Sequence, residues 1–262
     1  GHWLAPHLAD RPYPDAPLYY WSAAVTGFAF SWLLPLHDAI RLASGFWVAL
    51  ILFLLYRAGR EWHCNEEAPH EFAIASVLAM AGCLGFLVHA HEAQPMLVAL
   101  AGHAAAYWAL ALLPRKPQRA AIIFGLGLGL GFLGNGLAAM LTLLPVALIA
   151  LWLAKDRTQS GSSLLLGALL GAAIATPWPI LLAAFQADYF AVWLASELVQ
   201  FGKPANIAHT AWTYVSMVPW FAWPALPLAL WTLRSKRRML REPAYLIPIL
   251  ATLAAWLTLS IT

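Results

Sequence analysis

Residues 120–154, AAIIFGLGLGLGFLGNGLAAMLTLLPVALIALWLA, contain no charged side chain. About 20 apolar residues suffice for one helical crossing of a bilayer whose hydrocarbon core is about 30 Å thick. The stretch is therefore long enough for two crossings, and the small residues Gly134–Gly136 interrupt it near its middle. It predicts two membrane helices, over 119–135 and 137–154.

The composition of the whole chain agrees with this prediction. Of the 262 residues, 62% are hydrophobic and 10% are charged, whereas soluble domains average about 45–50% and 25%. The 14 tryptophans suit membrane–water interfaces. A net charge of +3 is too small to indicate nucleic-acid binding, and two cysteines, Cys64 and Cys83, provide no disulfide framework. We predict an all-α polytopic membrane protein, since membrane helices satisfy their own backbone hydrogen bonds.

The apolar runs predict about eight transmembrane helices. They cover 39–56, 71–88, 95–114, 119–135, 137–154, 163–182, 208–233 and 243–261.

The basic residues predict the orientation of these helices. Twelve of the 15 lie in connections that fall on one side, and the positive-inside rule makes that side cytoplasmic. Six acidic residues lie on the other, outer side. A crossing by the apolar segment 17–36 would place every basic cluster outside, so we expect it to be an outer interfacial helix. The basic clusters are Arg57 and Arg60; Arg115, Lys116 and Arg119; Lys155 and Arg157; and Arg234, Lys236, Arg237, Arg238 and Arg241.

Several motifs carry both a structural and a chemical interpretation. Gly129, Gly131 and Gly134 match a dinucleotide-binding spacing, but the strand that this motif requires is missing, so close helix packing through Gly127/Gly131 and Gly167/Gly171 is favoured.

The turn His89-Ala90-His91-Glu92 is either a solvated loop or a metal or substrate site. His103, in mid-span, favours a hydrogen bond between helices over a ligand role. Asp10 and Asp15 flank Arg11 in a proline-rich outer loop. The loop is either a structured one in which the arginine forms an ion pair, or one whose two carboxylates serve as acid–base groups.

Five stretches, in order, resemble a known enzyme family. GHWLAPHLADRPYPDAPLYYW resembles a first outer loop with the pattern G-D-W-x-x-P-x-x-x-G-x-P-Y-x-E-K-P-P-L-x-Y-W. GLGLGLGFLGNGLAAMLTLLP resembles a G-L-G-F-L-T-K-G-P span. The family's A-R-L-P-S segment has its counterpart in HDAIRLASGFWVALILFLLYRAGR. Its P-W-Y segment resembles TPWPILLAAFQADYFAVWLASELVQF, and its Pro/Trp-rich segment resembles HTAWTYVSMVPWFAWPALPLALW. The family is the ArnT-like branch of the protein O-mannosyltransferase superfamily, glycosyltransferase family 39, with a GT-C membrane fold.

The resemblance implies transfer of a sugar from a polyprenyl-phosphate donor, at the outer face of the bacterial inner membrane, to a lipid A-like or protein acceptor. Such a transfer needs a general base and stabilisation of the departing phosphate, by a cation or a divalent metal ion. The family's acidic metal-associated position corresponds to Asp15, its following lysine to Ala16, and its T-K-G lysine to Asn135. A further family aspartate falls on Pro95, so Glu92 is its candidate substitute.

The resemblance thus yields a set of candidate site residues. The catalytic candidates are Asp15 and Glu92; the substrate-binding candidates are Tyr19, Tyr20, Asn135 and Lys203; and the metal-binding candidates are Asp15, Glu197 and His209.

The family's catalytic Asp–Glu motif would precede Gly1, so we expect a single GT-C-like module cut from a longer enzyme, inactive alone. Residues 1–36 would form the outer loop and interfacial helix, and 37–262 the transmembrane bundle.

Two alternatives stay open. One is a transporter or flippase for a lipid-linked substrate, for which no internal repeat is evident. The other is a non-catalytic, degenerate homologue.

Overall fold

The computed structural model describes residues 3–8, 11–12, 15–202 and 207–261. This part of the chain is almost entirely helical, and its only strands are two-residue segments, β1 (His7–Leu8) and β2 (Arg11–Pro12), paired antiparallel. The helices are α1 (Leu18–Phe30), α2 (Leu36–Trp62), α3 (Pro69–Gly82), α4 (Leu84–His89), α5 (Met96–Leu112), α6 (Pro117–Leu153), α7 (Arg157–Ala175), α8 (Pro177–Phe185), α9 (Ala187–Gly202), α10 (Ile207–Phe221), α11 (Ala225–Ser235), the 3₁₀ turn η1 (Arg237–Met239) and α12 (Pro243–Ile261).

Helix α6 is two helices that run in opposite directions. Asn135 and Gly136 have non-helical backbone angles, and Gly136 has a φ of 56°. A methyl group on Gly131 would lie 3.2 Å from a side-chain carbon of Leu143, although residues twelve positions apart in one straight helix are separated by about 18 Å. The chain therefore reverses at Asn135–Gly136, as the interruption at Gly134–Gly136 predicted.

Helices cover all eight apolar runs, and the all-α membrane fold is confirmed. Three of the runs are each divided between two helices: 71–88 at Cys83, 163–182 at Thr176 and 208–233 at 222–224. By length and apolarity, three segments of the described chain qualify as membrane spans: Leu36–Trp62, Pro117–Leu153 and Arg157–Phe185. The count of about eight crossings stays a prediction. Helix α1 has 13 residues, or about 20 Å of helix, which is shorter than the hydrocarbon core.

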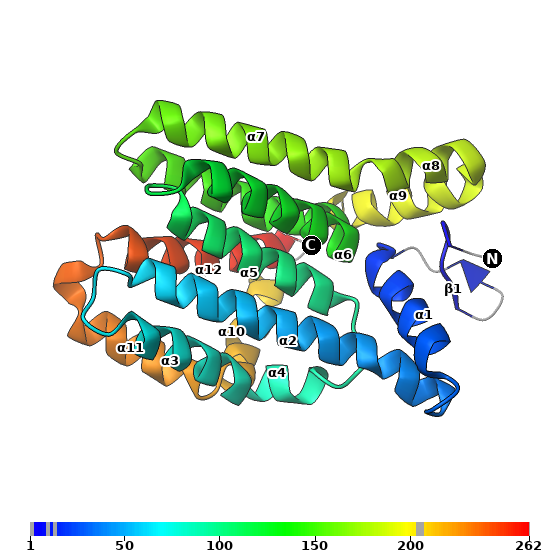
Figure 1. Cartoon of the computed structure of the whole chain (residues 1–262), viewed down its shortest axis with the longest axis horizontal. Helices are drawn as coiled ribbons and strands as arrows, with labels where there is room; N and C mark the ends of the chain where they lie inside the picture. The colour runs from blue at the N-terminus through cyan, green and yellow to red at the C-terminus, as the bar shows by residue number, and fades with distance from the viewer. Residues whose placement is uncertain (1–2, 9–10, 13–14, 203–206, 262) are drawn as a thin grey trace.

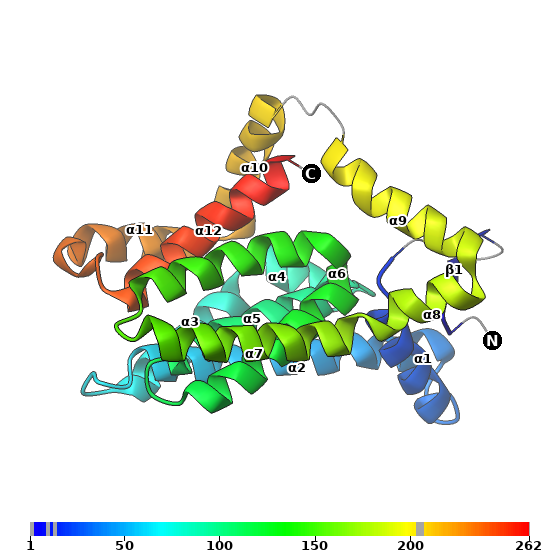
Figure 2. The ribbon, with the colours of Figure 1, turned by 90° about the horizontal axis from the view of Figure 1, so that it is seen from above.

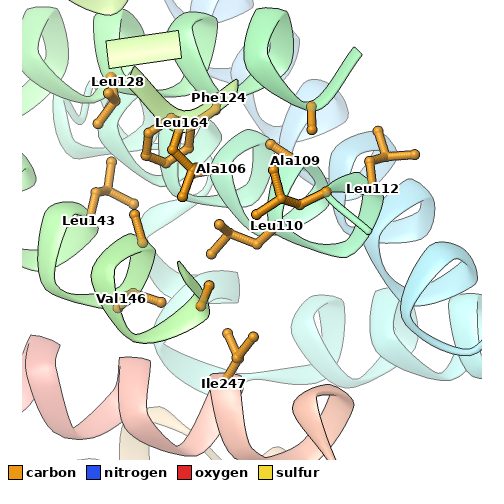
Figure 3. Close-up of a cluster of buried hydrophobic side chains, with 14 of the residues drawn as sticks. Ala106, Ala109, Leu110, Leu112, Phe124, Leu128, Leu143, Val146, Leu164 and Ile247 are labelled. Carbon is orange, nitrogen blue, oxygen red and sulfur yellow. The ribbon is translucent and has the colours of Figure 1, made fainter. Parts of the chain in front are cut away.

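The bundle is built around α5, which packs against α2 and α6, while α6 also packs against α7. Where α5 crosses α6, a methyl group on Gly102 would lie 2.5 Å from the backbone nitrogen of Gly131, so the two backbones touch. Figure 3 shows the core beyond this crossing, where Ile247 of α12 faces Leu110 and Val146. His103 Nε2 lies 2.6 Å from Thr142 Oγ1 on α6, which confirms the predicted hydrogen bond between helices.

The molecule has two chemically different ends (Figure 1). At one end, the α2–α3 and α5–α6 connections meet, where Arg115 pairs with Glu61 at 3.1 Å. The α6–α7 and α11–α12 connections, which carry the other basic clusters, lie at the same end; we call it the basic end. At the opposite end, α1, the β1–β2 hairpin, α8 and α9 gather, in the views of both Figure 1 and Figure 2.

Candidate functional site

Asp15 lies at the end opposite the basic end, just before α1. The hydroxyl of Tyr20 donates a 2.9 Å hydrogen bond to its Oδ2. Pro17 precedes the first residue of α1, and the first helical turn brings Tyr20 back over Asp15. Burial raises the pKa of the Asp15 carboxyl above its usual value, and the Tyr20 hydrogen bond partly opposes this shift.

Glu197 of α9 is the most deeply enclosed acidic side chain of the described residues, with 6% exposure. Its Oε2 accepts a 2.8 Å hydrogen bond from the backbone N–H of Leu137, the first residue after the reversal in α6. Burial raises the pKa of Glu197, the Leu137 bond opposes this, and the nearby charge of Asp15 raises it further. The charge of Asp15, 182 positions earlier in the chain, therefore acts on Glu197, and we call these two carboxyl groups the acidic pair.

The reversal at Asn135–Gly136 creates the position that Glu197 occupies. The combination of φ 56° and ψ −139° at Gly136 is adopted almost only by glycine. A Cβ at Gly136 would also collide with the carboxylate oxygens of Glu197. The predicted substrate residue Asn135 thus lies in the same turn as the contact with Glu197, and is half-buried.

An aromatic cluster fastens the N-terminal segment to α8 and α9. The indole of Trp178 donates to the backbone oxygen of Leu4 at 2.9 Å, and the Tyr189 hydroxyl donates to that of Pro6 at 3.3 Å. Trp193 packs edge-on against Trp178, with ring centroids 5.0 Å apart. Burial raises the pKa of Tyr189, and the charge of Asp15 raises it further. Trp178, Tyr189 and Trp193 were not predicted as site residues, because their only signal in the sequence is the local density of Trp and Tyr.

The comparisons with known proteins agree on one family. The chain is 26% identical to undecaprenyl phosphate-alpha-4-amino-4-deoxy-L-arabinose arabinosyl transferase 2 of Proteus mirabilis, over 94% of the chain and 45% of that protein. A relative of the same kind from Sodalis glossinidius is 27% identical over 84% of the chain and 40% of its own length. One from Erwinia tasmaniensis is 26% identical over 97% and 51%. The chain is thus similar, along most of its length, to transferases of the ArnT-like family.

The ArnT-like chain spans about half the length of these curated relatives. No family model matches it, and no solved structure matches it significantly.

The remaining predicted residues of the ArnT-like chain divide into three groups. Tyr19, next to Tyr20, is buried, and its hydroxyl lies 2.7 Å from that of Ser44 on α2, so it packs between α1 and α2. Glu92 lies in a separate turn, where its carboxylate contacts His89 Nδ1 at 2.7 Å and accepts from Gln94 at 3.0 Å. These hydrogen bonds lower the pKa of Glu92.

The third group lies outside the described residues. Lys203 and Asp10 are not described, and of His209 only its backbone, in α10, is described.

The acidic pair of this ArnT-like chain has the donor chemistry for a divalent cation, though not a complete ligand set. Among the described side chains, no three His, Cys, Asp or Glu residues gather closely enough to hold a metal ion. Magnesium, however, is commonly held by only one or two carboxylates together with water and substrate phosphate. Asp15 and Glu197 supply carboxylate oxygens of this kind, and a hydrogen bond orients one oxygen of each.

Proposed function

We propose that the chain is part of a membrane glycosyltransferase that transfers a sugar from a polyprenyl-phosphate donor to a lipid A-like or protein acceptor. The observation that carries this proposal is the similarity along 94% of the chain to arabinosyl transferases whose names specify an undecaprenyl phosphate sugar. The acidic pair Asp15–Glu197 supports the same conclusion, because the two carboxylates come from segments that the family resemblance had independently singled out.

The proposed site faces outward from the bacterial inner membrane. Asp15 directly precedes α1 and Glu197 belongs to α9, and both helices lie at the end opposite the basic end (Figure 1). The positive-inside rule makes the basic end cytoplasmic. A polyprenyl-phosphate donor in the outer leaflet would then present its phosphate and sugar at the level of α1 and α9. Tyr20 and Asn135, which border the pair, are the proposed substrate contacts, with Lys203 as a further one.

Asp15 is the proposed reactive carboxylate. Attack by an acceptor hydroxyl on the anomeric carbon requires removal of the hydroxyl proton, and a carboxylate whose pKa is raised toward neutrality is a better base than an ordinary aspartate. The raised pKa of Asp15 and its orientation by Tyr20 fit this role. Glu197, held by Leu137, would keep the pair in place.

A divalent cation at Asp15 and Glu197 would neutralise the phosphate that leaves the donor. The two carboxylates would bind it through oxygens, and the Tyr20 and Leu137 hydrogen bonds would keep those oxygens oriented. The Asp15 charge raises the pKa of Glu197, and a bound cation would reverse that effect. His209 is a proposed further ligand.

The test uses the full-length protein that contains this chain, in membranes. The donor is undecaprenyl phosphate 4-amino-4-deoxy-L-arabinose, labelled in the sugar, and transfer to lipid A and to protein is measured. Asp15→Asn should lower kcat by about 100-fold or more, as the loss of a general base typically does. Asp188→Asn is the matched control, because Asp188 is an exposed aspartate on α9, on the same helix as Glu197. Glu92→Gln tests the second catalytic candidate in the same assay.

Three results would contradict the proposal. Transfer of sugar to neither acceptor, together with no binding of the donor, would indicate a non-catalytic homologue. Movement of the labelled donor across sealed vesicles without cleavage of its sugar–phosphate bond would indicate a flippase. Full activity in Asp15→Asn would remove Asp15 from the reaction.

A further inference from the structure

A cleft at the basic end separates the first turns of α6 and α7. It has a volume of about 650 Å³. Its lining changes in character along its length, from cationic at the α5–α6 connection, through amide and hydroxyl groups, to apolar side chains farther into the bundle. The lining residues are Arg115, Lys116, Pro117, Gln118, Arg119, Ala121, Gln159, Ser162, Ser163 and Leu166.

The cationic part of the cleft has more positive charge than the protein neutralises. Arg115 is paired with Glu61 at 3.1 Å. Within the described part of the chain, no acidic side chain pairs with Lys116 or Arg119. Asp156, which begins α7, accepts a hydrogen bond from the backbone N–H of Gln159 and is exposed, so it caps α7 instead.

The backbone adds to this positive potential. Helix α6 begins at Pro117, and Lys116 at its N-cap makes no capping hydrogen bond with its side chain. Helix α7 begins at Arg157, one turn before the lining residues Gln159 and Ser162. The N-terminus of each helix carries a partial positive charge and N–H groups that favour anions such as phosphate. The uncapped N-terminus of α6 lies in the cleft lining at Lys116 and Pro117, whereas the N-terminus of α7 is capped by Asp156.

The apolar part of the cleft continues onto the lipid-facing surface of α7. Leu166 lines the cleft and is 59% exposed, and Leu165 and Leu169, with 63% and 60% exposure, continue the surface toward the middle of the bundle. Ile122 of α6 is similarly exposed. A hydrocarbon chain that starts at the cleft would therefore run along these leucines without leaving apolar surface.

We propose that this cleft binds one anionic phospholipid of the leaflet on the basic side, with its phosphate at Lys116 and Arg119 and an acyl chain along Leu166. A purely topological role for the basic residues requires only that they lie on the cytoplasmic side. It does not require them to line a cleft, to meet an uncapped helix N-terminus, or to adjoin an exposed apolar surface. A lipid headgroup with attached chains matches all three features, whereas a soluble phosphate would use only the polar half.

The experiment uses the full-length protein, purified in detergent and depleted of lipid. Phosphatidylglycerol is added, with phosphatidylcholine as the zwitterionic comparison, and bound lipid is counted by native mass spectrometry. Lys116→Gln combined with Arg119→Gln should weaken binding of phosphatidylglycerol by about 30-fold, since each basic residue near an anionic headgroup contributes roughly fivefold in affinity. The control pair, Arg238→Gln with Arg241→Gln, removes the same charge from another basic loop at this end.

A second arm tests the acyl-chain contact and the source of the phosphate. Leu166→Gln, an exposed position where folding should be unaffected, should also weaken retention of phosphatidylglycerol, and thermal unfolding of each variant checks its fold. Glycerol 3-phosphate, which carries the anionic group without the chains, should not compete at the same concentration. Equal losses in the control pair, unchanged binding in the cleft variants, or full competition by glycerol 3-phosphate would each overturn the assignment to a lipid.

Discussion

Gly136 provides the sharpest test of the architecture around the acidic pair. It permits the chain to reverse within α6, and its missing side chain leaves room for the Glu197 carboxylate. Gly136→Ala should therefore disturb both the reversal and the position of Glu197. No polar group is removed by this substitution, so any loss must come from backbone strain or from displacement of Glu197.

The expected magnitude has two parts. Holding alanine at φ 56° and ψ −139° costs about 1–3 kcal/mol. The new Cβ would also force the Glu197 carboxylate away from the N–H of Leu137, and the loss of a hydrogen bond to a charged group costs about 1.5–3 kcal/mol. Together these terms destabilise the fold by roughly 3–6 kcal/mol, which corresponds to a decrease in Tm on the order of 10 °C.

Thermal unfolding in detergent, followed by the fluorescence of the 14 tryptophans, measures this loss. Gly45→Ala is the matched control, because Gly45 lies inside α2 with no atom within 4 Å of its Cβ position. There the same substitution should be neutral or stabilise by about 0.5–1 kcal/mol, as helical Gly→Ala changes do.

A double-mutant cycle separates the two parts of the cost. In a Glu197→Ala background the carboxylate is absent, so Gly136→Ala should cost only the backbone part, about 1–3 kcal/mol. If Gly136→Ala proved as stable as Gly45→Ala, the reversal would not need glycine. If its cost were the same with and without the Glu197 carboxylate, the proposed contact between the two residues would be refuted.

Three further predictions follow from the same geometry. Burial and the charge of Asp15 raise the pKa of Glu197, so its neutral form stabilises the fold at low pH and this stabilisation is lost as the pH rises through the raised pKa. In wild type the Tm should therefore fall from about pH 4.5 upward, and Glu197→Gln should flatten that decrease. An unchanged pH profile of Tm in the variant would contradict this. His103→Ala and Thr142→Val should show a coupling energy of about 0.6 kcal/mol in a double-mutant cycle, and additive losses would argue against the bond. Gly102→Val should force α5 and α6 apart and cost more than 3 kcal/mol in unfolding free energy, whereas a normal Tm would exclude the close crossing.

Much of the fold could be predicted because membrane helices leave strong local signals. Each apolar run corresponds to a helix or a pair of helices, since backbone polar groups in a bilayer must be satisfied within the segment. The Asn135–Gly136 reversal was visible as a Gly-Asn-Gly interruption, and the basic clusters predicted which connections share one end. The division of 71–88 at Cys83 was not predicted, although Gly82 and Gly85 lie on either side of the break.

The acidic pair could be predicted only in part. The family resemblance singled out Asp15 and Glu197 separately, but no local pattern relates residues 182 positions apart. The segment that precedes Asp15 is fastened to α8 and α9 by Trp178 and Tyr189, which donate hydrogen bonds to the backbone oxygens of Leu4 and Pro6. Every residue has the same backbone oxygen, so a sequence does not indicate which of these oxygens will accept a side-chain hydrogen bond.

The sequence by itself therefore determined the class of the protein, its helical segments and the chemical difference between its two ends, because hydropathy and charge act locally along the chain. Only the tertiary structure decided which candidate residues act together. It set Glu197 against the reversal in α6 and Asp15 against Tyr20, and it left Tyr19 packed against Ser44 and Glu92 in a turn with His89. The physical reason is that a buried carboxylate needs a hydrogen-bond donor and space. Glu197 finds the donor in the backbone N–H of Leu137 and the space beside Gly136, and both depend on how the helices pack.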